Sequence, residues 1–463
     1  MQPSGFAKTD RDPIENASMS WPRILRLGLV QASIGAVVVM LTSIVNRVMI
    51  VELALPAVIP GLLVALHFAI QFALRPSLGH GSDLTGHREH WIMGGMVLLA
   101  ACGTGAAASA AWVETNPTAG LAAATLCFLG VGAGVSAAGT PLFAILAERV
   151  APARRPQAAA LVLVIMIVGF IVTTAVVSRF IAPFSWSRLV EATAAVGLVA
   201  TVVTVLAARG IERGPAAGTL RRRDRRGIDF RSALRAVLAD PEARAFCWFR
   251  FLSMLAYSAQ DLILEPFAGV VFGATPAEST RISSMHRGGM LVGMVVTAAF
   301  AARSRTASRW ASAGCMLSAA FLVALALAPL TGSLTTVKYA VVGLGVGNGM
   351  FAIGALTTMM ELGAAHVDGR SGLRMGVYGA VEAVAMGAAG LLGAGAFDVA
   401  RSLLGSATAG YMTVLSGEAI VFGVAAVLAA RSATPAHAAL SAHANAVASA
   451  ATGAEPGTEL AHG

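Results

Sequence analysis

The chain has few charged residues and few cysteines, and its composition is not that of a soluble domain. Only 12% of its 463 residues are charged, whereas 56% are hydrophobic, and the mean hydropathy is +0.74. This composition excludes an ordinary soluble globular domain and indicates an integral membrane protein. The four cysteines stand singly, without a C-x-x-C pair. We therefore expect buried small hydrophobes and no disulfide framework.

Catalytic signatures are absent from the sequence as well. It contains no G-x-S-x-G turn, no H-E-x-x-H helix and no Asp-rich prenyltransferase pattern. The glycine runs at 130–134 and 343–349 do not have the spacing of a dinucleotide loop, and neither follows a strand in a βαβ unit. They are typical of helices that approach each other closely. The sequence therefore favours a protein that is not an enzyme.

Long apolar runs make up most of the chain. Because a helix needs about 20 apolar residues to cross the hydrocarbon, and because the runs lack the alternation of a β-barrel, we predict an all-α polytopic membrane protein. Twelve transmembrane helices are expected, in two six-helix bundles. The predicted spans begin near Leu27, Ala57, Trp91, Ala119, Ala158, Leu189, Phe246, Met285, Trp310, Thr336, Arg374 and Tyr411.

Breaks in the apolar rhythm divide the chain into five predicted parts. These are a cytoplasmic N-terminal segment (1–23), an N-terminal bundle (24–208), a basic linker with an amphipathic helix (209–245), a C-terminal bundle (246–431) and a disordered tail (432–463). Met1 to Ser20 is polar and lacks the apolar core of a signal peptide.

Arginine and lysine set the expected orientation. Of the 33 basic residues, 26 fall on the side shared by both termini and 7 on the other. Since positive charge is retained inside, we expect both termini in the cytoplasm. The net charge of +9 is thereby a topology signal, and nothing else in the sequence favours nucleic-acid binding.

The linker combines a basic run with an apolar stripe. Five arginines lie between Arg221 and Arg226, where anionic lipid headgroups are the nearest partners. Phe230, Leu234, Val237 and Leu238 follow at helical spacing. They predict a helix on the membrane surface that ends at Asp240-Pro241. The alternative is a linker helix without a partner.

The loop between the second and third spans carries a G-x-x-x-D-x-x-G-x-R pattern, formed by Gly79, Asp83, Gly86 and Arg88. It resembles the signature of the major facilitator superfamily, whose two bundles rock about a midplane cavity. We expect a gating loop in which Asp83 accepts hydrogen bonds from the start of the eleventh span, at 372–376, while Arg88 braces the loop. The counterpart at 302–309 lacks the Asp and the glycines, so any gate is asymmetric.

Several longer sequence motifs resemble those of one branch of that superfamily. They are Asn46-Arg47-Val48-Met49-Ile50-Val51-Glu52-Leu53, Ala138-Gly139-Thr140-Pro141 with Ala147-Glu148-Arg149-Val150, Gln260-Asp261-Leu262-Ile263-Leu264-Glu265-Pro266, and Gly417-Glu418-Ala419-Ile420-Val421-Phe422. Between about residues 25 and 431 the chain is similar to the PucC/LhaA family. The resemblance implies bacteriochlorophyll as cargo or bound pigment and a role in light-harvesting complex assembly. It further implies a bacterial inner (cytoplasmic or intracytoplasmic) membrane, with antenna polypeptides and pigment-biosynthesis enzymes as partners.

Polar residues inside the first two spans are candidates for pigment binding, because ionisable groups at membrane depth are costly. His67 and Gln71 share one helix face. His67 is a candidate axial ligand for the magnesium of a chlorin, although a histidine in an apolar helix also commonly hydrogen-bonds a neighbour. Asn46, Arg47 and Glu52 lie at the far end of the first span. They predict either a structural ion pair or a ligand site.

Three acidic residues are candidates for proton or partner binding. Asp261 and Glu265 lie one turn apart in the seventh span, where two close carboxylates resist joint ionisation. The alternative is a wet position with ion pairs to Arg281 or Arg287. Glu382 in the eleventh span, one turn after Tyr378, reads as a lone buried acid.

Two functions remain open at this stage. The resemblance favours a bacteriochlorophyll-binding and delivery protein, for which His67 is the central candidate. The alternative is a proton-coupled antiporter for a small solute, which requires a wet cavity with a titrating acid such as Asp261, Glu265 or Glu382.

Overall fold

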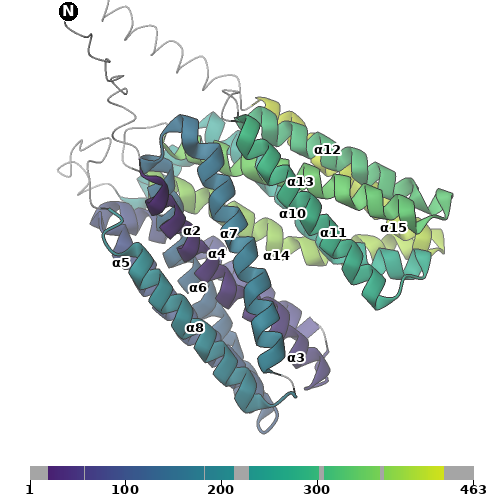
Figure 1. The fold of residues 1–463 in the computed structure, drawn as a ribbon, viewed down its shortest axis with the longest axis horizontal. Coiled ribbons are helices and arrows are strands. Elements are labelled where there is room, and N and C mark those ends of the chain that lie inside the picture. Colours follow the sequence, from purple (N-terminus) through teal and green to yellow (C-terminus); the bar gives the residue numbers. More distant parts are fainter. Residues whose placement is uncertain are drawn as a thin grey trace, which may run out of the picture.

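The computed structural model describes residues 19–56, 58–181, 183–212, 229–301, 307–364 and 370–431, whose regular structure is entirely helical. The helices form two groups that lie side by side (Figure 1). The first group contains α2 (Trp21–Val39), the π-helical η1 (Met40–Val45), α3 (Asn46–Val51), α4 (Val58–Thr85), α5 (Arg88–Val113), α6 (Pro117–Arg149), η2 (Pro152–Arg154), α7 (Arg155–Phe180) and α8 (Trp186–Ala208). The second contains α10 (Pro241–Phe272), α11 (Pro276–Ala301), α12 (Ala307–Leu327), η3 (Ala328–Thr331), α13 (Leu334–Ala364), α14 (Ser371–Leu404) and α15 (Ala407–Arg431). The short α9 (Phe230–Ala239) precedes the second group.

Ten helical segments in the described part of the chain are long and apolar enough to cross a membrane. This confirms the predicted all-α polytopic membrane fold. The two long helices outside that set are α10, with 32 residues, and α11, with 26. Both pack within the second bundle. The count of twelve spans stays a prediction for these two, and the predicted part boundaries stay predictions as well.

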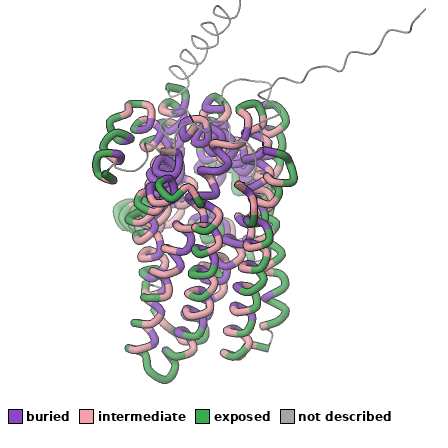
Figure 2. Tube along the Cα trace, turned by 90° about the vertical axis from the view of Figure 1, so that its left-hand side faces the viewer, coloured by how far each residue is buried: buried purple, intermediate pink, exposed green. Residues whose placement is uncertain are grey.

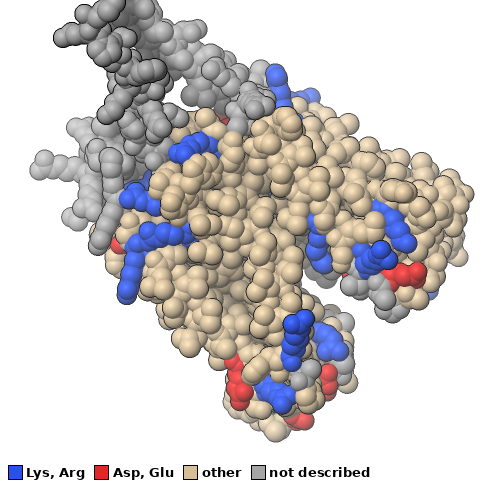
Figure 3. Space-filling model, in the orientation of Figure 1, with Lys and Arg blue, Asp and Glu red and all other residues tan. Residues whose placement is uncertain are grey.

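The two bundles meet at one end and diverge toward the other. We call the end at which α4 finishes and α14 begins the closed end, because buried residues concentrate there (Figure 2). The opposite end, where α3 lies, is the open end (Figure 1). The space-filling view shows a gap between the two lobes that widens toward the open end, with basic side chains on its walls (Figure 3).

Glycine permits close helix contacts in both bundles, as the glycine runs predict. A Cβ atom at Gly134 of α6 would lie 2.7 Å from the Leu99 amide nitrogen of α5. One at Gly345 of α13 would overlap the His286 carbonyl of α11. Any larger residue would push these helices apart, which is costly in an interior packed as densely as a crystal.

The amphipathic helix of the linker is present as α9, and it ends at Ala239 as predicted. Asp240 then caps α10 by accepting a hydrogen bond from the Glu242 amide. However, Val237 is fully buried, and Phe230 and Leu234 pack against the hydrophobic core. The interpretation of the stripe as lipid-facing is wrong, because these side chains find protein partners, including the His80 ring 5.7 Å from Phe230. Only Leu238 is well exposed, at 44%.

Three predicted features lie outside the described residues. They are the arginine run at 221–226, most of the second-half loop (302–306) and the tail at 432–463. The N-terminal segment is described only from residue 19, and α2 begins at Trp21, slightly before the predicted start of the bundle.

Candidate functional site

Asp83 joins the two bundles at the closed end. Its Oδ1 accepts a hydrogen bond from the Gly372 amide at 2.9 Å, and its Oδ2 accepts one from the Leu373 amide at 2.9 Å. Both amides belong to the first turn of α14, where N–H groups lack intrahelical acceptors and negative charge is favoured. The structure thus contains the contact predicted for Asp83. A role of this contact in gating stays a prediction.

Arg88 holds Asp83 in place from the start of α5. Its Nη2 donates to Asp83 Oδ1 at 2.7 Å and to Ser371 Oγ at 2.9 Å, while its Nη1 donates to Glu148 Oε2 at 2.6 Å. The Arg88 and Asp83 side chains are each only 5% exposed. We call Asp83, Arg88, Glu148 and Ser371 the closed-end cluster. Because its members come from α4, α5, α6 and α14, the cluster links both bundles.

Each of the two glycines of the loop pattern is required for a different structural reason. A Cβ at Gly79 would lie 2.6 Å from the carbonyl carbon of Gly372, so only glycine lets α4 cross α14 at this point. Gly86 has φ +64° in the turn between α4 and α5, a conformation that other residues adopt only with strain. Both glycines therefore serve the geometry that brings Asp83 to α14.

A second polar group lies toward the middle of the helices, and we call Gln71, Arg75, Arg250 and Glu382 the cleft cluster. Arg75 of α4 donates to the Gly379 carbonyl of α14 at 3.0 Å and also to Gln71 Oε1. Arg250 of α10 donates to Glu382 Oε2 of α14 at 2.7 Å. Arg75 also interacts electrostatically with both Glu382 and Arg250. Four charged or polar side chains from three helices thus converge between the bundles.

The pairing of Glu382 corrects the prediction of a lone buried acid. Its carboxylate forms an ion pair with Arg250, and its side chain is 25% exposed. Tyr378, one turn earlier, is fully buried and stacks edge-on against Phe246. The sequence could not identify the partner, because Arg250 lies 132 positions away on another helix.

His67 is buried inside the N-terminal bundle, with 3% of its surface exposed. Its Nε2 lies 2.7 Å from Gln71 Nε2, and since an amide nitrogen can only donate, the imidazole nitrogen is the acceptor. His67 and Gln71 thus share a face as predicted. Magnesium ligation by His67 stays a prediction, and ligation through Nε2 requires Gln71 to release it.

The predicted residues at the end of the first span are more exposed than His67. Arg47 and Glu52 form a loose pair at 3.9 Å, with side chains 67% and 32% exposed. Asn46 is half-buried where α3 follows the π-helical turn. A surface pair of this kind contributes little to stability, and a ligand role for these residues stays a prediction.

The acidic pair of the seventh span is described only in part. Glu265 is exposed and accepts a hydrogen bond from Ser283 Oγ at 2.6 Å. Asp261 lies in α10, but its side chain is outside the described part of the structure. A proton or partner role for either residue stays a prediction.

The interior of the C-terminal bundle contains a polar network that sequence reasoning missed. Asn348 of α13 lies 2.9 Å from His286 Nε2 of α11 and accepts a hydrogen bond from Ser318 of α12 at 2.8 Å. All three side chains are buried. Such a network fixes the mutual rotation of three helices, because breaking it would leave buried polar groups unpaired.

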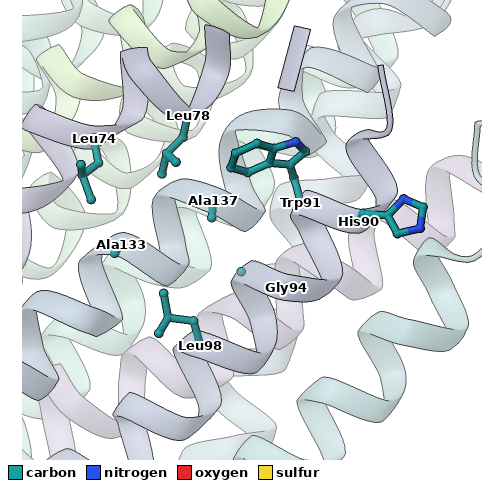
Figure 4. Close-up of a pocket in the computed structure, with 9 residues that line it drawn as sticks. Leu74, Leu78, His90, Trp91, Gly94, Leu98, Ala133 and Ala137 are labelled. Atoms are coloured by element: carbon teal, nitrogen blue, oxygen red, sulfur yellow. The ribbon is translucent and has the colours of Figure 1, made fainter. Parts of the chain in front are cut away.

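A groove of about 430 Å³ opens on the surface of the N-terminal bundle between α4, α5 and α6 (Figure 4). Its volume lies within the range of roughly 300–1,000 Å³ typical of small-molecule sites. Small residues form much of the lining, the Trp91 indole lies over it, and His90 stands at its rim with the imidazole turned away from Trp91 (Figure 4). The lining residues are Leu74, Leu78, His90, Trp91, Gly94, Gly95, Leu98, Ala133 and Ala137.

The groove is more accessible than the surroundings of His67, which is only 3% exposed. Gly94 is exposed, and a Cβ there would meet no atom within 4 Å. His90 is also exposed, so its imidazole is accessible as a Lewis base. Sequence reasoning missed this groove, because it depends on which helices become neighbours.

Four residues of the two clusters were not among the predicted site residues. Arg75 had a signal, because it is a charged side chain one turn after Gln71 in a predicted span. Arg250 had a signal, because a charged side chain in a predicted span is a functional candidate by default. Glu148 belongs to one of the motifs that carry the family resemblance, but no role was predicted for it. Ser371 had no signal, since a serine at a helix start is common in any protein.

Comparison with known proteins adds three findings on sequence. Residues 44–435 match the family described as PUCC protein. A Rhodobacter capsulatus protein named bacteriochlorophyll synthase 44.5 kDa chain is 44% identical over 418 residues, which cover 89% of this chain and 95% of that protein. The protein PucC of Rhodovulum sulfidophilum is 30% identical, over 86% of this chain and 90% of its own.

Solved structures with the same fold are transporters. A bacterial homologue of the iron transporter ferroportin in an outward-facing state matches with a TM-score of 0.70 at 15% identity, covering 89% of this chain and 99% of that one. FucP, a major facilitator superfamily transporter in the outward conformation, matches with a TM-score of 0.67 at 14% identity, covering 89% and 97%. These similarities establish the major facilitator fold and no substrate.

Proposed function

Because the chain belongs to the PUCC protein family, we propose that it binds bacteriochlorophyll and hands it to light-harvesting polypeptides during assembly of photosynthetic complexes. A family named for PucC and a relative named for bacteriochlorophyll both support a role in this process. The word synthase in the relative's name describes that protein, and the transporter fold of this chain favours a binding role over a catalytic one. The protein acts in the bacterial inner membrane, cytoplasmic or intracytoplasmic, with both termini in the cytoplasm.

The groove between α4, α5 and α6 is the observation that carries this proposal. A chlorin ring with its isoprenoid tail is largely apolar, so it reaches such a groove from the lipid without crossing water. Glycine and alanine on α5 and α6 leave room for a flat ring, and Trp91 supplies an aromatic face. Release to an antenna polypeptide is then a lateral step within the membrane.

Two histidines are candidates for the axial bond to magnesium. His90 stands at the rim of the groove and is exposed, so a change of rotamer brings its imidazole toward a bound ring. His67 has a neutral, accepting Nε2 that is already engaged by Gln71. A pigment bound through His67 would lie deeper in the bundle and would displace Gln71 from the imidazole.

A second function is favoured by a different observation. The Arg250–Glu382 ion pair joins two helices of the second bundle and interacts electrostatically with Arg75 of the first. A proton-coupled antiporter for a small solute places its titrating acid at such an interface. In that case Glu382→Gln abolishes transport into vesicles, while pigment content and antenna levels do not depend on the protein.

Variants in a pigment-producing host lacking the native gene test the proposal. Gly94→Leu fills the groove, whereas Gly395→Leu adds the same volume at an exposed position on α14 where a Cβ also meets no atom within 4 Å. We expect the first variant to lose co-purified bacteriochlorophyll and to lower antenna levels, and the second to retain both. His90→Leu and His67→Leu then identify the axial ligand. Equal pigment content in Gly94→Leu and Gly395→Leu would exclude the groove as the pigment site.

A further inference from the structure

The cleft cluster carries an unbalanced positive charge. Arg75 and Arg250 contribute two guanidinium groups, and Glu382 contributes the carboxylate that pairs with Arg250 and interacts electrostatically with Arg75. The remaining neighbours on α4, Gln71 and His67, hydrogen-bond each other as neutral groups. An excess charge among largely buried side chains is costly, and a bound anion relieves the cost.

Most donors of the two guanidinium groups have no acceptor among the residues that the structure describes. Each guanidinium has five N–H donors, but Arg75 uses its terminal nitrogens on Gly379 and Gln71, and Arg250 uses one on Glu382. Both Nε atoms are buried without a hydrogen-bond partner among the described residues. The Arg250 side chain is only 10% exposed. These donors are therefore fixed in position and available to a ligand.

The two arginines approach the same space from opposite bundles. Arg75 extends from α4 across α14, where Gly379 leaves room for it, since a Cβ there would lie 3.0 Å from Arg75 Cδ. Arg250 extends from α10 to Glu382, about one helical turn beyond Gly379 on α14. A ligand held by both guanidiniums would lie between the bundles, because α4 belongs to the first bundle and α10 to the second.

We propose that the cleft cluster is a binding site for a carboxylate, held between Arg75 and Arg250. Planar guanidiniums match carboxylate oxygens in a two-bond geometry, which a lysine pair would not provide. Glu382 accepts a hydrogen bond from the Arg250 guanidinium, so it competes with the ligand for Arg250. The groove between α4, α5 and α6 is a separate site, and this inference does not depend on pigment binding there.

The carboxylate has two possible sources. One is a small free acid that enters from the aqueous gap. The other is the propionate of a pigment precursor that has not yet received its isoprenoid alcohol, since esterification removes this negative charge. The free acid of bacteriochlorophyllide and its methyl ester separate the two sources, because they share one ring and differ only in the carboxylate.

Binding to purified full-length protein in lipid nanodiscs tests the site. We expect acetate or bacteriochlorophyllide free acid to bind, with acetamide and the methyl ester as neutral controls that do not. Arg75→Gln and Arg250→Gln should each weaken binding at least tenfold, whereas Arg309→Gln, at an exposed arginine of α12, should not. Glu382→Gln should tighten binding, because it frees donors on Arg250.

The Glu382 variant also separates ligand binding from a structural role. If the cluster only held the helices together, Glu382→Gln would weaken or abolish any binding along with the fold. The inference is overturned if neither carboxylate binds, or if binding is the same in Arg250→Gln as in the wild type. A pigment that binds equally as acid and ester, and that responds only to Gly94→Leu, would overturn the carboxylate site while leaving the groove proposal intact.

Discussion

Neutralising Asp83 tests whether charge holds the closed end together. When the bundles part at this end, Asp83 leaves the Gly372 and Leu373 amides but keeps Arg88, because α4 and α5 belong to the same bundle. The contribution of Asp83 to the closed state is therefore its interaction with the start of α14. A charge at a helix N-terminus contributes about 0.3–2 kcal/mol, and hydrogen bonds to charged groups contribute about 1.5–3 kcal/mol.

The variant Asp83→Asn retains one side-chain acceptor but loses the charge. We expect it to favour opening of the closed end by about 1–3 kcal/mol, which is roughly a 5- to 150-fold change in the ratio of the two states. A cysteine at Ala147 serves as reporter, because this residue is fully buried and lies near Gly363 of the other bundle. The four native cysteines are first replaced by alanine.

Alkylation of the reporter with a membrane-impermeant thiol reagent gives the readout. The rate should rise in Asp83→Asn and stay unchanged in Asp398→Asn, which neutralises an exposed carboxylate elsewhere on α14. An unchanged or lower rate in Asp83→Asn would refute the reasoning, because the Asp83 contact would then contribute nothing to closure.

Three further predictions concern packing and are measured as thermal unfolding in detergent. Gly79→Val should destabilise the protein by about 1–3 kcal/mol through overpacking against Gly372, and an unchanged melting temperature would show that α4 and α14 are not held at this crossing. Val237→Asp should be strongly destabilising because it buries a charge, whereas Leu238→Asp one position away should have little effect; equal effects would restore the lipid-facing interpretation of α9. Asn348→Leu should cost about 1–3 kcal/mol by removing the buried hydrogen bonds of Asn348 with His286 and Ser318, and an unaltered stability would mean that the network does not contribute.

The sequence was informative wherever a local pattern determines the outcome. Continuous apolar runs require helices in a membrane, so the fold class followed from composition and run length. The Asp83 contact was predictable because the loop pattern places a carboxylate beside the start of a specific span. The glycine runs likewise predicted close helix contacts, since absence of a side chain has few other uses inside a bundle.

Prediction from sequence failed where the outcome depends on which helices become neighbours. The apolar stripe of α9 has the same periodicity whether it faces lipid or protein, and only the fold shows Val237 buried. Glu382 looked unpaired because Arg250 is distant in sequence. The groove beside Trp91 is formed by three helices together, and no single segment carries its pattern.

The absorbance spectrum of the wild-type protein tests the central claim most directly. The full-length chain is expressed in a pigment-producing host, purified under mild conditions and compared with Gly94→Leu prepared in parallel. The account predicts a bacteriochlorophyll band that accompanies the wild-type protein in a fixed ratio and is reduced in the variant. A colourless wild-type protein, together with normal antenna levels in a host that lacks the gene, would contradict it.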